Sequence, residues 1–306
     1  MKAALASRSR DAASGFILIA VLWIVAALAT LASIYSIYAI NTTAGSHLAD
    51  DRLQAEASIR AGVELAVFQL VGAPEGARPT HGAFEARVGR TKIAVRYRTE
   101  RALVDLNAAP KELLAGLFGA VGVGDAAAAG YAGHIVAWRT KPDPHKADND
   151  EASAYKAAGL TYPPRQGPFN DPLELSLVLG LPPKIVERIL PDVTIFSSAA
   201  QVDVVTADPE VLAALPGMTP DILNNVLRAR GSYGENRQPL IAMLGAAGQS
   251  AATGAGKAFR AFVLVDFGRG RRVSAEVVFT LADAAAEEPY QILYWRDDFD
   301  GPFASG

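Results

Sequence analysis

The chain of 306 residues contains no cysteine, so neither a disulfide nor thiol chemistry is available to it. This absence does not indicate a compartment, because a domain of this size can bury a core without disulfides. A surplus of positive charge is also missing. The formal net charge is −3, whereas a nucleic-acid-binding domain usually carries a basic surplus. Apolar residues make up half of the chain, which predicts one or two folded domains.

Catalytic motifs are missing as well. The sequence holds no Gly-x-Ser-x-Gly elbow, no P-loop and no dinucleotide-binding fingerprint. Its four histidines show no pairwise spacing for a metal: His47, His81, His134 and His145. His134 falls in an apolar helical segment, where we expect a packed or cap-facing side chain. We therefore expect that the chain is not an enzyme.

One stretch near the N-terminus lacks charge altogether. No acidic or basic residue occurs from Phe16 to Ile40. As a helix this stretch would be roughly 37 Å long, which is enough to cross a bilayer. Lys2, Arg8 and Arg10 precede it against a single acid, Asp11. This bias predicts a transmembrane helix with a cytoplasmic N-terminus.

Three interpretations of this segment compete. A cleaved secretory signal is excluded, because its apolar core would be about 7–15 residues long and would end in small residues. Here the apolar run is longer, and Tyr35 and Tyr38 stand where a cleavage site should be. A plain membrane anchor remains open. The third interpretation is a prepilin-type leader, favoured by Gly15 and Phe16 at the membrane edge, since glycine lets an enzyme cleft bind the backbone closely.

The sequence Gly15-Phe16-Ile17-Leu18 resembles the N-terminus of type IV pilin-like proteins and of the pseudopilins of type II secretion. The resemblance implies that a peptidase cleaves between Gly15 and Phe16 and that Phe16 is N-methylated. Most family members carry Glu five residues into the mature chain, but this chain has Ala20. A carboxylate at that depth is costly without a partner. In the family, its omission is typical of the minor, K-type pseudopilin at the filament tip.

The helix is predicted to continue beyond the bilayer. From Asn41 to Val71 there is no proline, and apolar residues recur at helical spacing until Gly72-Ala73-Pro74. Alternating residues then predict strands in two regions far apart in sequence: Ala83–Val88, Thr91–Thr99, Phe259–Phe267, Arg271–Leu281 and Tyr290–Trp295. Antiparallel pairing between the two regions would close one sheet and leave the middle of the chain inserted.

The middle of the chain is predicted to be helical and repetitive. Residues 104–117 parallel residues 202–215, and in each copy an extended stretch precedes a helix. Asn107 or Thr206 would accept an unpaired backbone N–H as the helix cap. A weaker third unit spans 171–182 and is followed by Ile185–Ile189.

These units resemble helix-hairpin-helix repeats, which often bind DNA. Of the turns, only Gly122-Val123-Gly124 has the Gly-hydrophobic-Gly pattern, and no Lys or Arg occurs from Gly119 to Trp138. Phosphate contacts without cations are weak, so we interpret the repeats as structural. The same pattern, with an inserted Pro-Phe-x-x-x-x-Glu-Leu segment, is characteristic of K-type pseudopilins. Here that segment is 168–175.

A polar loop from Lys141 to Tyr155 carries a group of hard oxygen ligands: Asp143, Asp148, Asn149, Asp150 and Glu151. Such ligands suit calcium, and K-type relatives carry an acidic loop here that is associated with it. We therefore name Asp143, Asp148, Asp150 and Glu151 as a candidate calcium site, the only cofactor expected. A solvated acidic loop is the alternative, because Lys141 and Lys146 partly neutralise it. The C-terminal acids Asp297, Asp298 and Asp300 are interpreted as a solvated tail.

These features predict an α+β fold. A long N-terminal transmembrane and spine helix packs on an antiparallel, pilin-like β-sheet, and a large inserted helical domain contains helix-hairpin-helix-like repeats. The predicted segments are a leader, a transmembrane helix, the remaining helix with the first strands, the inserted helical domain, a second helical segment, and the last strands with the tail: 1–15, 16–40, 41–105, 106–192, 193–258 and 259–306.

The resemblance implies a structural component of type II secretion, a minor pseudopilin that helps to initiate and cap the periplasmic pseudopilus, which exports folded proteins across the outer membrane. Implied partners are other minor pseudopilins and the pseudopilus, the prepilin peptidase, the inner-membrane secretion platform and the lipid bilayer, with nucleic acid not expected. The chain would be a single-pass protein of the bacterial inner membrane with a periplasmic head. Its expected interfaces are the apolar faces of Phe16–Ile40 and Leu53–Leu70. The alternative is a membrane-anchored periplasmic DNA-binding protein of an uptake system.

Overall fold

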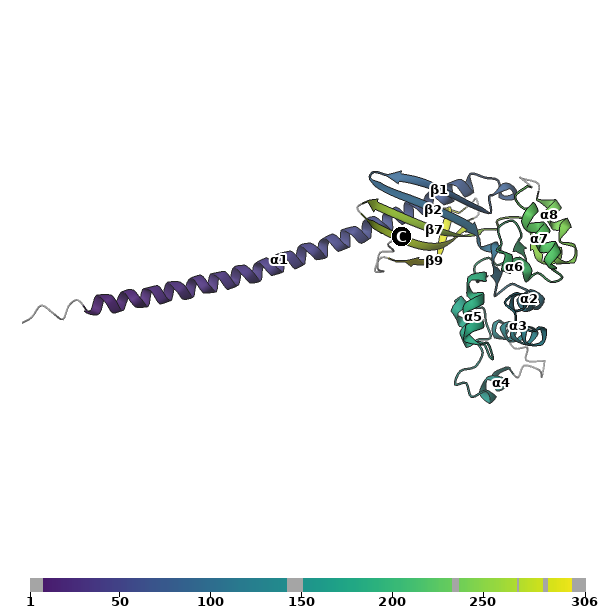
Figure 1. Cartoon of the computed structure of the whole chain (residues 1–306), viewed down its shortest axis with the longest axis horizontal. Helices are drawn as coiled ribbons and strands as arrows, with labels where there is room; N and C mark the ends of the chain where they lie inside the picture. Colours follow the sequence, from purple (N-terminus) through teal and green to yellow (C-terminus); the bar gives the residue numbers. More distant parts are fainter. Residues whose placement is uncertain (1–7, 142–150, 233–236, 269, 283–285, 299–306) are drawn as a thin grey trace, which may run out of the picture. The chain divides into compact units, whose positions relative to one another are not determined.

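The computed structural model describes residues 8–141, 151–232, 237–268, 270–282 and 286–298; within the first helix it describes side chains at 18–36 and from 52 onward. That helix, α1, runs from Arg8 to Val71 (Figure 1). The chain divides into two compact units, Met1–Ala57 and Ser58–Gly306. The described part of the first unit is helical throughout, so the predicted continuation of the apolar helix beyond residue 40 is confirmed.

The second unit contains a five-stranded antiparallel sheet in the order β1-β2-β7-β8-β9 (Figure 1). Its strands lie where the alternation of residues predicts them: β1 His81–Val88, β2 Thr91–Thr99, β7 Ala258–Gly268, β8 Arg271–Leu281 and β9 Tyr290–Asp297. β2 pairs with β7, so that Arg98 lies opposite Arg260. This pairing confirms that the two distant β regions close one sheet around an insertion.

The last turns of α1 cover one face of this sheet. Ile59, Val63 and Leu70 are fully buried there. Gly62 allows the close approach, because a Cβ at this position would lie 3.0–3.1 Å from three sheet side chains, those of Ile93, Val95 and Val263. The apolar residues of this helix do not all share the buried face, however. Leu65 and Phe68 are exposed.

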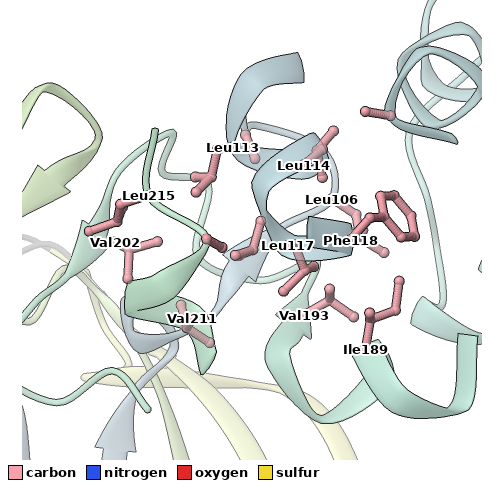
Figure 2. Packing of buried hydrophobic residues seen from close by; sticks show 14 of the residues in the cluster. Leu106, Leu113, Leu114, Leu117, Phe118, Ile189, Val193, Val202, Val211 and Leu215 are labelled. Carbon is pink, nitrogen blue, oxygen red and sulfur yellow. The ribbon is translucent and has the colours of Figure 1, made fainter. Parts of the chain in front are cut away.

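The insertion between β2 and β7 is mostly helical. Its short 3-10 turns are η2 Glu100–Ala102, η3 Pro172–Leu177, η4 Leu190–Asp192 and η5 Gly245–Ser250, whereas η1 Glu75–Ala77 lies between α1 and β1. Its helices are α2 Lys111–Ala120, α3 Asp125–Arg139, α4 Glu151–Ala157, α5 Pro183–Ile189, α6 Pro209–Ala213, α7 Pro220–Ala229 and α8 Gln238–Met243. Residues from the whole insertion form one hydrophobic cluster, in which Leu117 of α2 and Val211 of α6 both take part (Figure 2).

Two copies of one supersecondary unit build this insertion. In the first, β3 (Val104–Asp105) pairs in parallel with β4 (Val193–Thr194), and α2, α3 and α5 lie between them in sequence. In the second, β5 (Val202–Asp203) pairs in parallel with β6 (Ala251–Ala252), and α6, α7 and α8 lie between them. The two similar sequence segments therefore both begin with a short strand that pairs in parallel and then a helix, whereas their helix-hairpin-helix character stays a prediction.

Equivalent residues make equivalent contacts in the two copies. Arg139 Nη2 donates to the Ala109 carbonyl at 2.6 Å, and Arg230 Nη1 donates to the Ala207 carbonyl at 2.8 Å. The turn between the first two helices needs a positive φ in both copies. Gly122 supplies it at 83° and Gly217 at 81°, a conformation that other residues rarely adopt.

The predicted helix caps were wrong. The turn before each helix is held instead by Asp105 and Asp203, whose carboxylates accept backbone N–H groups of the residues that follow, including Ala108 at 3.1 Å in the first copy. Asn107 bonds to the backbone of Phe169, and the Thr206 hydroxyl donates to the Thr80 hydroxyl at 2.6 Å. The carboxylates of Asp105 and Asp203 hold these turns because each of them accepts from several backbone N–H groups at once.

The weaker third unit is not a further helical pair. Its first part, η3, is a 3-10 turn, and α5 belongs to the first copy, which it leads back to β4. Leucines at short spacing are compatible with either a 3-10 turn or an α-helix, and here Pro172 at the start and Val178 in extended conformation at the end keep the turn short.

Candidate assembly surfaces and processing site

The N-terminal part of α1 exposes a long apolar surface. Leu18–Ser36 has a mean hydropathy of 2.4, and no side chain in it is buried. By length and composition it could cross a membrane, and it is the one such helix among the residues that the structure describes. The hydroxyls of Thr30 and Ser33 are satisfied within the helix, because each donates to a carbonyl one turn earlier, that of Thr30 to Ala26 at 2.8 Å.

The expected processing site lies in the backbone of α1. Gly15 and Phe16 are helical, whereas their side chains fall outside the described ones. Ala20 follows on the same helix and is partly exposed. A peptidase cleft that binds extended backbone would have to unwind the first turns of α1, and glycine at the cleavage point lowers the cost of doing so. The cleavage itself stays a prediction.

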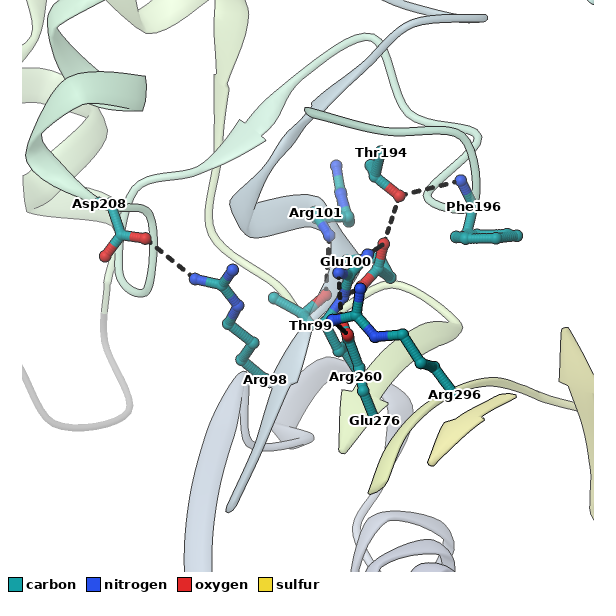
Figure 3. A network of polar contacts seen from close by, with 10 residues as sticks. All are labelled: Arg98, Thr99, Glu100, Arg101, Thr194, Phe196, Asp208, Arg260, Glu276 and Arg296. Atoms are coloured by element: carbon teal, nitrogen blue, oxygen red, sulfur yellow. Dashed lines mark hydrogen bonds and ion pairs between the residues drawn. The ribbon is translucent and has the colours of Figure 1, made fainter. Parts of the chain in front are cut away.

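A buried charge network joins the sheet to the insertion. Glu100 in η2 is fully buried, and its Oε1 lies 2.7 Å from Nε of Arg260 on β7. Arg260 Nη1 reaches Glu276 Oε1 at 2.5 Å, and Glu276 also pairs with Arg296 (Figure 3). On the insertion side, the hydroxyl of Thr194 donates to Glu100. The single arginine thus links two carboxylates at the point where the insertion leaves the sheet.

The two carboxylates favour the charged form of Arg260. Burial by itself would lower the pKa of Arg260, but the hydrogen bonds and charges of Glu100 and Glu276 outweigh it and raise that pKa. The guanidinium therefore stays charged, and both carboxylates have a partner. Sequence reasoning missed this network, because Glu100 and Arg260 are brought together only by the pairing of β2 with β7.

A second charged group lies nearby, where the two copies meet. Nη1 of Arg98, on β2, is 3.0 Å from Oδ2 of Asp208, the residue that precedes α6 in the chain (Figure 3). Burial, followed by the charges of Glu210 and Asp208, raises the pKa of Asp192 to about 6, and Arg98 only partly offsets this. The carboxyl of Asp192 is therefore the group here that titrates near neutral pH.

The Pro-Phe-x-x-x-x-Glu-Leu segment, residues 168–175, packs against the first copy through ring stacking and hydrogen bonds, and we call it the clamp. The Phe169 ring stacks on Trp138, with centroids 6.0 Å apart, and Asn107 bonds to both the N–H and the carbonyl of Phe169, at 2.7 and 3.0 Å. Glu174 accepts from Trp138 Nε1 at 3.3 Å and from Arg165 at 2.9 Å. The motif residues are thus structural.

The candidate calcium site is only partly visible. Asp143, Asp148 and Asp150 lie outside the described residues. Glu151 is described, and its Oε1 lies 2.7 Å from His134 Nδ1, so one of its oxygens already has a partner. Within the described residues, no group of three or more His, Asp or Glu side chains could hold a metal ion. Calcium binding therefore stays a prediction.

The helical hairpins carry acids where a phosphate would have to bind. Asp125 is in the first turn of α3 and Asp221 is in the first turn of α7. A helix N-terminus attracts anions, but a carboxylate already placed there opposes a second anion. The negative charge at these turns therefore does not favour the DNA-binding alternative.

Comparison with known proteins identifies a protein family and a similar solved structure. Residues 99–198 match the family described as "Type II secretion system (T2SS), protein K". The fold is similar to that of a chain in the crystal structure of the GspK-GspI-GspJ complex from the type 2 secretion system of enterotoxigenic Escherichia coli, with a TM-score of 0.61, 17% identity, and coverage of 81% of this chain and 97% of that one. No curated protein matches the sequence.

The family match covers η2 to the segment after β4, which is the first copy together with its clamp. The structural match adds the fold of most of the remaining chain. The structural match agrees with a mixed helical and antiparallel β fold, which in this chain follows an apolar N-terminal helix. On this evidence, residues 99–198 match the protein K family of the type II secretion system, and the fold of the chain is similar to that of a chain in the GspK-GspI-GspJ complex.

Proposed function

We propose that the chain is a minor pseudopilin that helps to initiate the pseudopilus and caps its tip. One observation carries the proposal: a K-type helical domain is inserted, between β2 and β7, into a sheet that packs on the continuation of an apolar helix. The helix is suited to lie among the helices of other subunits. The inserted domain is suited to end the filament, because a broad head blocks the place of the next subunit.

The membrane arrangement follows from the N-terminal segment. Leu18–Ser36 anchors the chain once in the inner membrane, with the N-terminus in the cytoplasm and the head in the periplasm. The prepilin peptidase cleaves between Gly15 and Phe16, and Phe16 is then N-methylated. Ala20, in place of a carboxylate, removes the need for a contact with the amine of another subunit. These steps are supported by the sequence pattern and by the exposed apolar helix.

Partners follow from the same arrangement. The Escherichia coli structure holds its chain in a complex with GspI and GspJ. We propose that the corresponding minor pseudopilins bind this chain, and that the pseudopilus and the inner-membrane secretion platform are its further partners. The role is structural, with no catalytic step assigned to any residue.

The processing step is tested by mass spectrometry of the full chain, expressed with and without a prepilin peptidase. A mature chain that begins at methylated Phe16 only when the peptidase is present is expected. Gly15→Val is the matched variant and should stay uncut, because a branched side chain blocks close binding of the backbone. A chain that keeps Met1 beside an active peptidase contradicts the proposal.

The capping role is tested separately in cells that assemble pseudopili. Deleting the gene should reduce the number of filaments and lengthen those that form, and restoring the full chain should reverse both effects. Restoring Ala20→Glu tests the terminal position: it is expected to incorporate along the filament as well as at its end. If the number and length of the filaments do not change, the capping role is contradicted, whereas the pseudopilin role is not.

A further inference from the structure

The C-terminal end of α1 and the start of β9 form an apolar groove with acidic residues beside it, which we call the α1–β9 groove. We propose that it docks a helix of a sibling minor pseudopilin that presents a large apolar side chain with Lys or Arg one turn away. The proposal rests on the proposed function and names the partner chemistry of the helical interface. The groove encloses about 320 Å³ and is lined by Glu64, Val67, Phe68, Val71, Pro289 and Tyr290.

The groove exposes more apolar surface than folding explains. Phe68 is 77% exposed and Val71 is 50% exposed, although both follow directly on the buried part of α1. Val67, which precedes Phe68, is buried at 4% exposure and also lines the groove. A ring as exposed as that of Phe68 contributes little to the fold of the head, and clustered apolar exposure is typical of a protein interface.

The shape of the groove favours a helix over an added strand. Glu64, Phe68 and Val71 are four and three residues apart, so they form a ridge along one side of α1, against which the ridges of a second helix can pack. The opposite wall begins with Pro289, which has no N–H to offer an added strand. The carbonyl of Pro289 is already taken by the N–H of Ala282 at 2.9 Å.

Charge selects the partner. After burial, the carboxylates of Glu64 and Glu288 help to raise the pKa of Tyr290, which places both beside the groove, and Arg60 acts in the opposite direction. Arg60 is engaged over the Trp295 ring, 5.7 Å from its centroid. Neither Glu64 nor Glu288 forms an ion pair with any residue that the structure describes. A partner that supplies Lys or Arg would therefore complete the site, whereas an acidic partner would be repelled.

Site-specific photo-crosslinking of the full chain tests the groove. Benzoylphenylalanine is introduced at Phe68 in cells that also express the sibling minor pseudopilins and the prepilin peptidase. The control position is Leu173 in η3, which is 62% exposed but lies outside the groove. We expect irradiation to join position 68 to a sibling at least about tenfold more than position 173. Equal yields at both positions, or adducts only with lipid or with a second copy of this chain, overturn the proposal.

Two variants measure the contribution of the ring and of the charges. Phe68→Asp and the pair Glu64→Lys with Glu288→Lys are each expected to lower co-purification of the sibling about tenfold, since both remove complementarity. Phe262→Asp, at an exposed apolar position on the other face of the sheet, should leave it unchanged. The urea midpoint of each purified variant must equal that of the wild type, and Phe68→Ser replaces Phe68→Asp if it does not.

The outcomes separate this inference from the proposed function. If the wild-type chain is processed and co-purifies with siblings, but the groove variants do so equally well, the groove is wrong and the pseudopilin role stands. If the wild-type chain remains uncut and no sibling co-purifies with it, both fall.

Discussion

Gly116 of α2 and Ala214, at the end of α6, lie at the same distance along the chain from Val104 and Val202, and they touch each other. A Cβ placed on Gly116 would lie 1.9 Å from the carbonyl oxygen of Ala214. Contact between equivalent positions is what a local two-fold relation between two copies produces. The glycine is needed at this point because the backbone of the second copy occupies the space of a side chain.

The first prediction concerns this contact. Gly116→Ala should lower the free energy of unfolding by about 1–3 kcal/mol, because the added methyl must displace backbone, not a flexible side chain. Urea unfolding of the full chain in detergent, followed by tryptophan fluorescence, measures the change. Gly119→Ala is the control, since it is in the same helix with nothing within 4 Å of the added Cβ. It should be neutral or stabilising, and an equal loss in both variants would contradict the contact.

The second prediction concerns the clamp on the first copy. Asn107→Ala removes both hydrogen bonds to the backbone of Phe169 and should cost about 1–3 kcal/mol. The segment 151–182 should then be cut faster in limited proteolysis of the full chain. Asn170→Ala is the matched control, because only the backbone N–H of Asn170 takes part in the contact with Glu174. Cleavage at the wild-type rate in Asn107→Ala would show that the ring packing holds the segment alone.

The third prediction concerns the buried network. Glu100→Leu leaves Arg260 with one carboxylate in place of two and should cost on the order of 3–5 kcal/mol, the usual effect of removing one partner of a buried ion pair. The urea midpoint of the head measures the loss. Arg272→Ala removes the exposed pair with Asp266 at the end of the same strands and should leave the midpoint unchanged. Equal midpoints in both variants would mean that the buried charges do not stabilise the joint.

The fourth prediction concerns pH. The pKa of Asp192 is raised from 3.8 to about 6 by burial and then by Glu210 and Asp208, so the folded state binds this proton more tightly than the unfolded state. The stabilising effect of protonation is complete below pH 3.8 and is lost as the pH rises through about 6. Asp192→Asn should therefore raise the free energy of unfolding at pH 7.5 by on the order of 1–3 kcal/mol.

That advantage should shrink steadily between pH 6.5 and roughly pH 4, where the wild-type carboxyl is itself neutral. Urea midpoints of the full chain across this range provide the measurement. Glu187→Gln, an exposed acid on the neighbouring α5, is the control and should show no such trend. A variant with the same advantage at every pH would place the effect in packing and not in titration.

Much of the fold follows from local pattern. The uncharged run that contains Leu18–Ser36 requires a membrane-compatible helix, and alternating residues such as those of Thr91–Thr99 require a half-buried strand. These elements are predictable because periods of 3.6 and 2 arise from backbone sterics within a few residues. The two similar segments that begin at Val104 and Val202 likewise indicate two units in which a short strand precedes a helix.

The helix caps, the interfaces and the charged joint were not predictable in this way. Asn107 has the chemistry of a cap, but Phe169, far along the chain, supplies its partners, and Asp105 holds the turn instead. Sequence spacing could not tell that Phe68 faces outward while Val67 is buried, because the packing of the sheet on α1 chooses the face.

By itself, the sequence determined an apolar N-terminal helix with a glycine–aromatic pair at its edge, two β regions, and a repeated helical insertion without catalytic motifs. Only the tertiary structure decided that β2 pairs with β7, that Gly116 meets Ala214, that Glu100 pairs with Arg260, and that an apolar groove with acidic residues beside it is left open at the start of β9. The reason is physical: periodicity is fixed by neighbours along the chain, whereas partners are fixed by which buried surfaces and charges the folded chain brings together.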